Sequence, residues 1–489
     1  MHGTPIDQSL RTNMEKLDQL FTDCADVLHR DAVLRGGQKV RVYYLDTVTD
    51  NDLIQRDVLS KLPSIKLSEL AEAQTENPLP VANYSIVDDI ETAMSDILKQ
   101  NTLLLADGLA FAISLSLSKP EHRAIAEPEI EKTIKGAHDG FIESLNINLS
   151  LIRRRFKTNN LKIKKYIVGE RSKQDLALVY IDEIANPDII KRMEDRLKSI
   201  DYDIITGIGY LEQLTTDHPF NIFPVYQVTE RPDRVAANLA EGRVAVLLEG
   251  TPVAIVAPAN FFQFFQAVDD YTTAWAFGSF LRLLRIFAIV IAIFLPGLYI
   301  AVLTFHYEAV PLTMLVPLLQ SRAKVPFTPI IEALIMELSF ELLREASTRL
   351  PATLGPTVGI VGGLVIGQTA VQAGIVSNIM VVIVGITAIA TFVVPTYDIG
   401  LLLRLSRFGA MILSAIFGIA GLAIYACIGV SYALSLESLG QPYLQPVMPF
   451  RFSEMKDTFI RAPFKYLSRR PVITRPRDST RGSGNNRAK

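Results

Sequence analysis

The chain has 489 residues, which is more than one ordinary domain holds, so we expect at least two structural units. Charged residues make up 20% and apolar residues 49%, with a formal net charge of −2, and these averages exclude a disordered or collagen-like chain. The two cysteines, Cys24 and Cys427, are too far apart in sequence to form a metal-binding motif or a disulfide framework.

The charges are distributed unevenly along the chain. Three long segments contain no Asp, Glu, Lys or Arg: Ile286–Tyr307, Leu350–Tyr397 and Phe408–Leu436. The last 39 residues, Arg451–Lys489, contain 11 Lys or Arg and 3 Asp or Glu, so they carry a net charge of +8 and the rest of the chain carries −10. This pattern predicts a soluble acidic part, a membrane part and a basic tail.

The N-terminal half is predicted to be a pair of α/β subdomains. A polar segment, 1–33, comes first and lacks the basic start and apolar core of a signal peptide, so we expect this part to be cytosolic. Residues 34–150 form the first subdomain, with a β-branched and aromatic strand at Lys39–Leu45. Residues 151–260 form the second, with a similar strand at Leu176–Ile181.

The order of elements repeats between the two subdomains. In each, a strand and a helix are followed by two strands that flank a turn with glycine, and several residues recur 136 or 142 positions later. The matching residues are Tyr44 and Asp46 with Tyr180 and Asp182, and Gly108 with Gly250. We interpret this as an internal duplication, the alternative being two unrelated units with a common strand–helix rhythm.

Residues 261–285 are crowded with aromatic side chains around the only tryptophan, Trp275. Aromatic rings favour the boundary between membrane and water, so we predict an interfacial helix anchored by Trp275. A core helix of the soluble part is the alternative.

The first predicted span is Ile286–Phe305, whose 20 uncharged residues suffice to cross a bilayer. Arg282 and Arg285 precede it, which predicts that the span starts in the cytosol. Pro296 and Gly297 in its middle predict a helix break, which is tolerated in a membrane only where neighbours satisfy the freed backbone groups.

Two segments after the first span are less clearly transmembrane. Ala309–Ser321 is apolar but has only 13 residues, so it is too short to span and is typical of a re-entrant segment. In the following helix, Glu337, Glu341 and Glu345 repeat every fourth residue and therefore share one face. We interpret this face as the wet side of an interfacial helix, with a cation path or a subunit contact as the alternative.

The 48-residue uncharged run is long enough for two spans, predicted at Val358–Val376 and Ile379–Val394. Glycine occupies every fourth position along the first of them, at Gly355, Gly359, Gly363 and Gly367. Such a ridge allows another helix to pack closely. Gln368 and Gln372 need hydrogen-bond partners inside a bilayer, so they are candidates for lining a pore or for hydrogen bonding between helices.

The last predicted span is Gly409–Tyr432, which gives an α-helical transmembrane region, 286–437, with about four spans. A proline-containing basic tail, 438–489, follows and favours the cytosol and contact with anionic membrane lipid. Four spans place Arg404 and Arg407 on the outer side, against the positive-inside tendency. An embedded segment at these arginines or a fifth passage would relieve this conflict.

Sequence signatures of enzymes are missing. The chain contains no GxxxxGK[ST] phosphate loop, no HExxH and no GxSxG motif, and its six histidines are scattered. The basic cluster Arg153–Arg155 is interpreted as a solvated face rather than a nucleic-acid patch. We therefore expect no enzyme activity, no cofactor, no metal site and no nucleic-acid partner.

Four long segments point to a known family. They are Pro219–Leu239, Glu241–Asn260, Val325–Leu350 and Thr357–Ser377. Together they resemble the A subunit of bacterial spore germinant receptors, the GerA family. The resemblance covers about residues 35 to 450 and leaves out the first 30 residues and the basic tail.

The resemblance implies a role in sensing the nutrients that end spore dormancy. It implies a multi-pass protein of the inner spore membrane, with its N-terminal domain and C-terminal tail in the cytosol. It also implies a transporter-like B subunit and a lipoprotein C subunit as partners, and self-association into a nutrient-gated ion channel. The alternatives are a non-conducting scaffold or signalling subunit, and an accessory paralogue of the stage V sporulation AF type.

Overall fold

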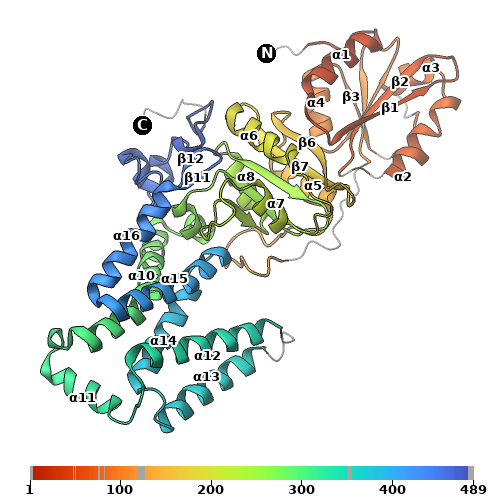
Figure 1. Cartoon of the computed structure of the whole chain (residues 1–489). Coiled ribbons are helices and arrows are strands. Elements are labelled where there is room, and N and C mark those ends of the chain that lie inside the picture. Colours follow the sequence, from red (N-terminus) through yellow and green to blue (C-terminus); the bar gives the residue numbers. More distant parts are fainter. Residues whose placement is uncertain are drawn as a thin grey trace.

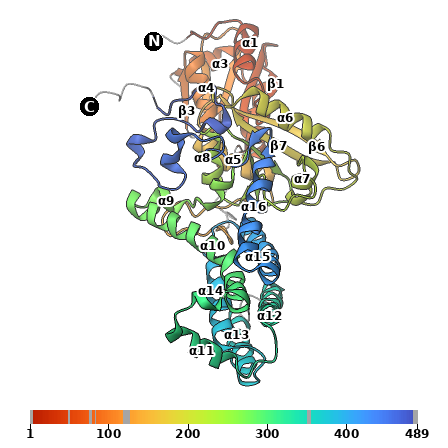
Figure 2. The same cartoon turned by 60° about the vertical axis from the view of Figure 1, so that its left-hand side comes forward.

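The structure, a computed structural model, describes residues 4–482 except 48, 50, 75–77, 82, 118–126 and 350–354, and it leaves out the side chains of 74, 355–361 and 364. Two α/β units follow each other at the N-terminal end, and a region of long helices extends from the second unit, away from the first (Figures 1 and 2). The C-terminal segment returns to the second unit, so both ends of the helical region connect to it.

The first unit is built around a five-stranded antiparallel sheet of order β1-β2-β4-β5-β3. Its elements are α1 (Leu10–Leu20), β1 (Val27–Val33), β2 (Lys39–Leu45), α2 (Asn51–Leu53) with a π-helical continuation (Ile54–Leu59), α3 (Leu67–Ala71), β3 (Tyr84–Val87), α4 (Ile90–Leu98), β4 (Thr102–Ala106) and β5 (Ala112–Leu115). The described part of the predicted polar segment 1–33 belongs to this unit, because α1 buries Leu10 and Leu17 in its core.

The second unit has the same strand order, β6-β7-β9-β10-β8, with every pair antiparallel. Its elements are α5 (Leu145–Arg155), β6 (Leu161–Val168), β7 (Gln174–Ile181), α6 (Pro187–Lys198), α7 (Ile208–Thr215), β8 (Gln227–Thr229), α8 (Pro232–Leu239), β9 (Val244–Leu248) and β10 (Ala254–Ala257). Helix α5 crosses the predicted boundary between 150 and 151 and packs within this unit.

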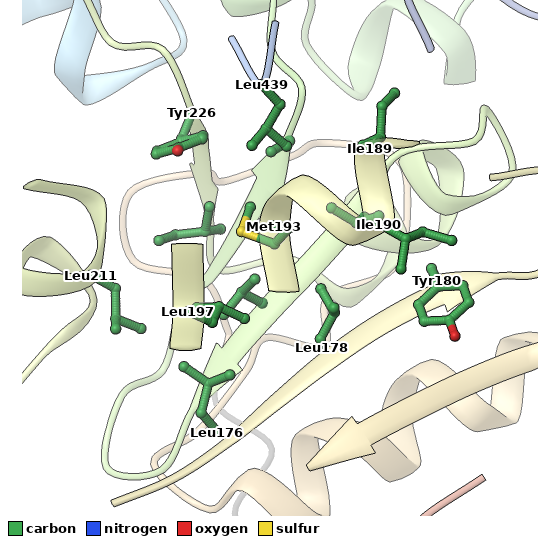
Figure 3. Close-up of a cluster of buried hydrophobic side chains, with 14 of the residues drawn as sticks. Leu176, Leu178, Tyr180, Ile189, Ile190, Met193, Leu197, Leu211, Tyr226 and Leu439 are labelled. Carbon is green, nitrogen blue, oxygen red and sulfur yellow. The ribbon is translucent and has the colours of Figure 1, made fainter. Parts of the chain in front are cut away.

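Alternating side chains on each sheet face two separate cores. In the second unit, Leu176, Leu178 and Tyr180 of β7 point to the side of α6 and belong to the same core as Met193 of that helix (Figure 3). The intervening residues of β7 point to α5 and α8 on the other side. The first unit is covered in the same way, so each unit is a sheet between two helical layers.

In each unit, one asparagine side chain makes the same two hydrogen bonds to a single backbone residue. The Asn13 side chain accepts from the backbone N–H of Asp7 and donates to the carbonyl of the same residue, at 2.9 and 2.6 Å. Asn148 makes the same two bonds to Ile142, at 2.8 and 2.6 Å. The glycines of the two turns, Gly108 and Gly250, both have positive φ, of 96° and 81°. The two units therefore agree in topology and in local detail.

A buried ion pair joins the two units. Arg153 of α5 donates two hydrogen bonds to Asp26, which lies just before β1, each at 2.8 Å, and both side chains are at most 1% exposed. Backbone bonds connect Ala25 and Ile163 at 3.0 Å, and Ile163 and Asp23 at 2.9 Å. The expectation that Arg153 lies on a solvated face is wrong, because this arginine fills the interface between the units.

Among its described residues, the helical region has two helices that are long and apolar enough to cross a membrane, α10 and α15. Its elements are α9 (Asp269–Thr272), α10 (Trp275–Phe305), α11 (Leu312–Arg322), α12 (Pro329–Arg349), α13 (Gly355–Gln372), α14 (Asn378–Phe392), α15 (Tyr397–Phe417), α16 (Ile419–Ser435), β11 (Glu437–Ser438) and β12 (Gln441–Pro442). Helices α11, α12 and α13 lie at the end farthest from the second unit (Figures 1 and 2). The number of spans stays a prediction.

Two predicted boundaries differ from the structure. The segment 261–285 is not one helix, because a 3-10 turn and α9 precede Trp275, where the long α10 begins. The predicted span Gly409–Tyr432 is divided at Gly418, whose φ of 63° ends α15 and starts α16. Apolar content alone did not mark this turn, because the residues on both sides are equally apolar.

The C-terminal segment folds back onto the second unit. Leu439 is fully buried in the core beside α6 (Figure 3). Arg470 donates from Nε to the carbonyl of Ala240 at 2.8 Å, and Arg481 pairs with Glu241 at 2.6 Å. In the part of the chain that the structure describes, several arginines of the predicted basic tail are thus bonded to the protein itself.

Candidate functional site

A buried ion pair joins α12 to α15 in the helical region. Glu337 accepts from Nη1 of Arg407 at 2.5 Å, and the two side chains are 1% and 3% exposed. Arg407 also donates from Nη2 to the hydroxyl of Thr391 in α14, at 2.8 Å. Charges in an apolar region are costly unless they are paired and hydrogen-bonded, so this pair holds three helices together.

The same arginine compensates for the proline in α10. Pro296 has no N–H, so the carbonyl of Ala292, four residues earlier, has no helical donor. Arg407 donates to this carbonyl from Nε at 2.8 Å. The hydroxyl of Ser414, also in α15, donates to the carbonyl of Gly297. The predicted break is therefore not a gap in α10, which continues from Trp275 to Phe305 with α15 supplying side-chain donors.

The other two glutamates of the predicted face are also in ion pairs. Glu341 lies 3.5 Å from Arg404 of α15 and 3.9 Å from Arg344 of its own helix. Glu345 pairs with Arg349 at 2.6 Å, one turn further along α12, and both of these side chains are largely exposed. Burial therefore decreases along the helix from Glu337 to Glu345.

The arrangement also explains the two arginines that conflicted with the positive-inside tendency. Arg404 and Arg407 both lie inside α15, where each meets a glutamate of α12. The sequence contained a signal for this pairing, namely glutamates and arginines in neighbouring apolar helices, because opposite charges in an apolar region are stable only when they are paired. The sequence could not specify which carboxylate each arginine meets.

One buried carboxylate was not singled out from the sequence. Glu332, at the start of α12, accepts from the backbone N–H and the hydroxyl of Ser377 at 2.6 and 2.5 Å, and lies 3.3 Å from Arg322 of α11. Tyr299 of α10 is 3.0 Å from the same hydroxyl. Glu332 lies outside the four-residue repeat of the glutamates that follow it, so periodicity gave no reason to select it.

The predicted glycine ridge runs along α13. A Cβ added at Gly367 would lie 3.3 Å from Val381 of α14, and one at Gly363 would lie 3.9 Å from Leu343 of α12. The closest such approach on α13 is at Gly362, 2.7 Å from Leu343, which is not in the predicted series. The surroundings of Gly355 and Gly359 lie outside the described residues.

Gln368 and Gln372 are both exposed on α13. Neither has a hydrogen-bond partner among the described residues. Val365 and Thr369 are exposed on the same side of the helix, at the i, i+3, i+4 and i+7 spacing of a single face. This face of α13 is therefore uncovered in a single chain and contains two primary amides.

The first turns of α10 connect to the soluble part through charges. Trp275 is half exposed at the first position of α10. Arg285 pairs with Asp270 at 2.7 Å, and Arg282 pairs with Asp457 of the C-terminal segment at 3.1 Å. Both arginines are buried, so they join α10 to the segments on either side of the helical region.

Metal-ligating side chains do not gather anywhere in the described part of the chain. No group of three His, Cys, Asp or Glu residues could hold a metal ion there. Cys24 is buried and Cys427 is exposed, and neither forms a disulfide. The described geometry consists of ion pairs and helix contacts, which position the helices.

Comparison with known proteins decides the family. The sequence profile described as Bacillus/Clostridium GerA spore germination protein matches residues 15–473. This chain belongs to the GerA family of spore germination proteins. The match includes the first unit from within α1 and most of the C-terminal segment, so it extends beyond residues 35 to 450 at both ends.

Relatives of this GerA-family chain are similar over almost their whole length. It is 38% identical over 480 residues to spore germination protein B1 of Bacillus subtilis (strain 168), covering 97% of this chain and 99% of that protein. It is also 38% identical over 487 residues to the uncharacterized membrane protein YfkQ of the same organism, covering 99% of this chain and 94% of that protein. These names describe germination and membrane proteins and no enzyme.

One solved structure is also similar. It is the crystal structure of the N-terminal domain of the A subunit of the Bacillus megaterium spore germinant receptor GerK3, with 28% sequence identity and a TM-score of 0.41. The similarity covers 53% of this chain and 99% of that domain.

Proposed function

We propose that this chain is the A subunit of a spore nutrient-germinant receptor and that copies of it assemble into a gated cation pore. It would be a multi-pass protein of the inner spore membrane with the two α/β units and the C-terminal segment in the cytosol. Membership of the GerA family supports the receptor role. The transporter-like B subunit and the lipoprotein C subunit are the expected partners, and lipid surrounds the apolar helices.

The uncovered face of α13 supports the pore. Gln368 and Gln372 are exposed on a helix that belongs to the apolar part of the chain. An amide without a partner is costly in hydrocarbon, so these side chains require either another copy of the chain or water. A ring of copies with α13 facing inward meets this requirement, since the amides then line an aqueous path. The paired Glu337 and Glu341 would hold α12 behind α13, while the Gln side chains contact ions.

Cation flux tests this proposal. The purified chain is placed in liposomes loaded with K⁺, alone and with its B and C partners, and efflux is measured after nutrient is added. Replacing both amides, Gln368→Leu and Gln372→Leu, should lower the flux ~10-fold or more by removing the polar lining. The matched control is Gln320→Leu on α11, which makes the same chemical change on another helix and should leave the flux unchanged.

A non-conducting scaffold is the second candidate. The ion pairs of Glu337 and Glu341 favour it, because they leave two of the three predicted carboxylates without a free charge for cations. In that case, a verified oligomer with its partners would give no flux under any condition, and release would occur elsewhere. An accessory paralogue of the stage V AF type would be separated from both by its genetic neighbourhood, which would lack B and C partners.

A further inference from the structure

The C-terminal segment and the second unit enclose a cavity of about 320 Å³, which we name the junction cavity. Glu241 and Arg243, between α8 and β9, line it on one side, and Glu454, Lys456, Asp457 and Arg469 line it on the other. It lies beside the attachment of α10, since Asp457 also pairs with Arg282. The volume is large enough for a small ion with several waters, but not for a peptide.

Arg243 is the most buried charge of the junction cavity, with 3% of its surface exposed. Its Nη1 donates to the carbonyl of Pro258 at 2.6 Å and to the side chain of Gln263. Its Nε has no hydrogen-bond partner among the described residues, and the nearest carboxylate oxygen, on Glu241, is 3.7 Å away. A buried guanidinium with an unpartnered N–H is costly, so an acceptor at this position would stabilise the site.

Two residues of the lining each have one buried polar atom without a hydrogen-bond partner among the described residues. These atoms are Nε of Arg243 and one carboxyl oxygen of Glu454. The N–H of Arg243 requires a hydrogen-bond acceptor.

The charged side chains of the lining also favour an anion. Five of the lining side chains are basic and three are acidic. The basic ones are Arg243, Lys456, Arg469, Arg470 and Arg481. Of the acidic ones, Glu241 is bonded to Arg481 at 2.6 Å, and burial raises the pKa of Glu454 and of Asp457. With five basic and three acidic side chains, the lining has an excess of positive charge, which favours an anion.

We propose that the junction cavity binds a small oxyanion, a carboxylate or a phosphate group, between Arg243 of the second unit and the basic residues of the C-terminal segment. The anion bridges the two and completes the hydrogen bonds of Arg243. Because Asp457 of the same lining is bonded to α10 through Arg282, a bound anion strengthens the attachment of the second unit to the first apolar helix. The site is independent of whether the chain conducts ions.

Anion-dependent stability tests the site. The thermal midpoint of the detergent-solubilised full chain is followed by the fluorescence of Trp275, the only tryptophan, while inorganic phosphate or acetate replaces chloride at constant ionic strength. Phosphate, acetate or both should raise the midpoint in a saturable way, and the two titrations identify which oxyanion fits. No increase over chloride with either anion would overturn the proposal.

Variants separate this site from general salt effects. Arg243→Gln and the double change Lys456→Gln with Arg469→Gln should each weaken the apparent affinity ~10-fold or more, because they remove charge-assisted bonds to the anion. The double change affects exposed side chains, so it stays informative if Arg243→Gln fails to fold. The matched control Arg171→Gln removes an exposed arginine of the second unit outside the cavity. Its apparent affinity for the anion should equal that of the unmodified chain. Equal affinity in all variants would contradict the site.

Discussion

Two buried arginine–carboxylate pairs, one in the α/β part and one among the long helices, differ in what surrounds them. Arg153 and Asp26 lie between two units that each have apolar cores of their own. Arg407 and Glu337 lie among α10, α12, α14 and α15, where the arginine also bonds a backbone carbonyl that Pro296 leaves without a donor. Arg153 also donates to the carbonyls of Thr158 and Leu161 in its own unit. The first pair joins two folded bodies, whereas the second lies among packed helices and supplies the donor that α10 lacks.

This difference has an energetic consequence. Water can reach a separated unit interface, so an unpaired Asp26 can regain solvation if the two units move apart. An unpaired Glu337 has no such route while α12 stays packed, and the Ala292 carbonyl loses its donor at the same time. Loss of Arg407 should therefore cost more than loss of Arg153.

The largest effect is expected for Arg407→Met. It should destabilise the helical region by about 3–5 kcal/mol, because it leaves a buried carboxylate and a buried carbonyl without partners. The measurement is the unfolding of the detergent-solubilised protein by circular dichroism. The control is the double variant Arg407→Met with Glu337→Met, which removes both charges and should recover most of the loss. A double variant as unstable as the single one would contradict the account.

A smaller effect is expected for Arg153→Met, about 3 kcal/mol at most, since Asp26 can be rehydrated. The loss should appear as a separation of the two units rather than as unfolding of either one. Limited proteolysis between α4 and α5 measures this, with Arg154→Met as the control on the same helix. Faster cleavage in the control as well would show that the pair is not what holds the units together.

The smallest effects are expected for Asn13→Ala and Asn148→Ala. Each removes two hydrogen bonds to one backbone unit, so each should cost about 1–2 kcal/mol. Because the two asparagines make the same contacts in the two units, the two losses should agree, which hydrogen exchange of the neighbouring amides can compare. A large loss in one unit alone would mean that the units agree in geometry but not in energetics.

Much of the α/β part could be predicted from the sequence. The strand Lys39–Leu45 is β2, and the strand Leu176–Ile181 lies within β7. These are local signals, set by β-branched and aromatic residues. The strand order β1-β2-β4-β5-β3 could not be predicted, because pairing between strands that are distant in sequence produces no local sequence pattern.

Less of the candidate site could be predicted. The four-residue spacing of Glu337, Glu341 and Glu345 put them on one face, but their partners are 63 or more positions away on α15 or one turn along the same helix. Arg404 and Arg407 conflicted with the positive-inside tendency because that tendency depends on the position of charges along the chain and not on their ion-pair partners. Glu332 was missed because it lies outside the four-residue repeat of the other glutamates, and Gly418 because the residues on both sides of it are equally apolar.

The sequence by itself determined the division into an acidic part and an apolar part and the strand composition of the α/β units, and its long matching segments identified the GerA family. Composition and periodicity decide the division and the strands, because burial depends on how polar a segment is and how its residues alternate. Only the tertiary structure decided that Arg407 both pairs with Glu337 and bonds the carbonyl freed by Pro296, and that the basic C-terminal segment encloses a cavity on the second unit. Those features depend on which distant groups meet at hydrogen-bond distance, and a few ångströms of packing determine that.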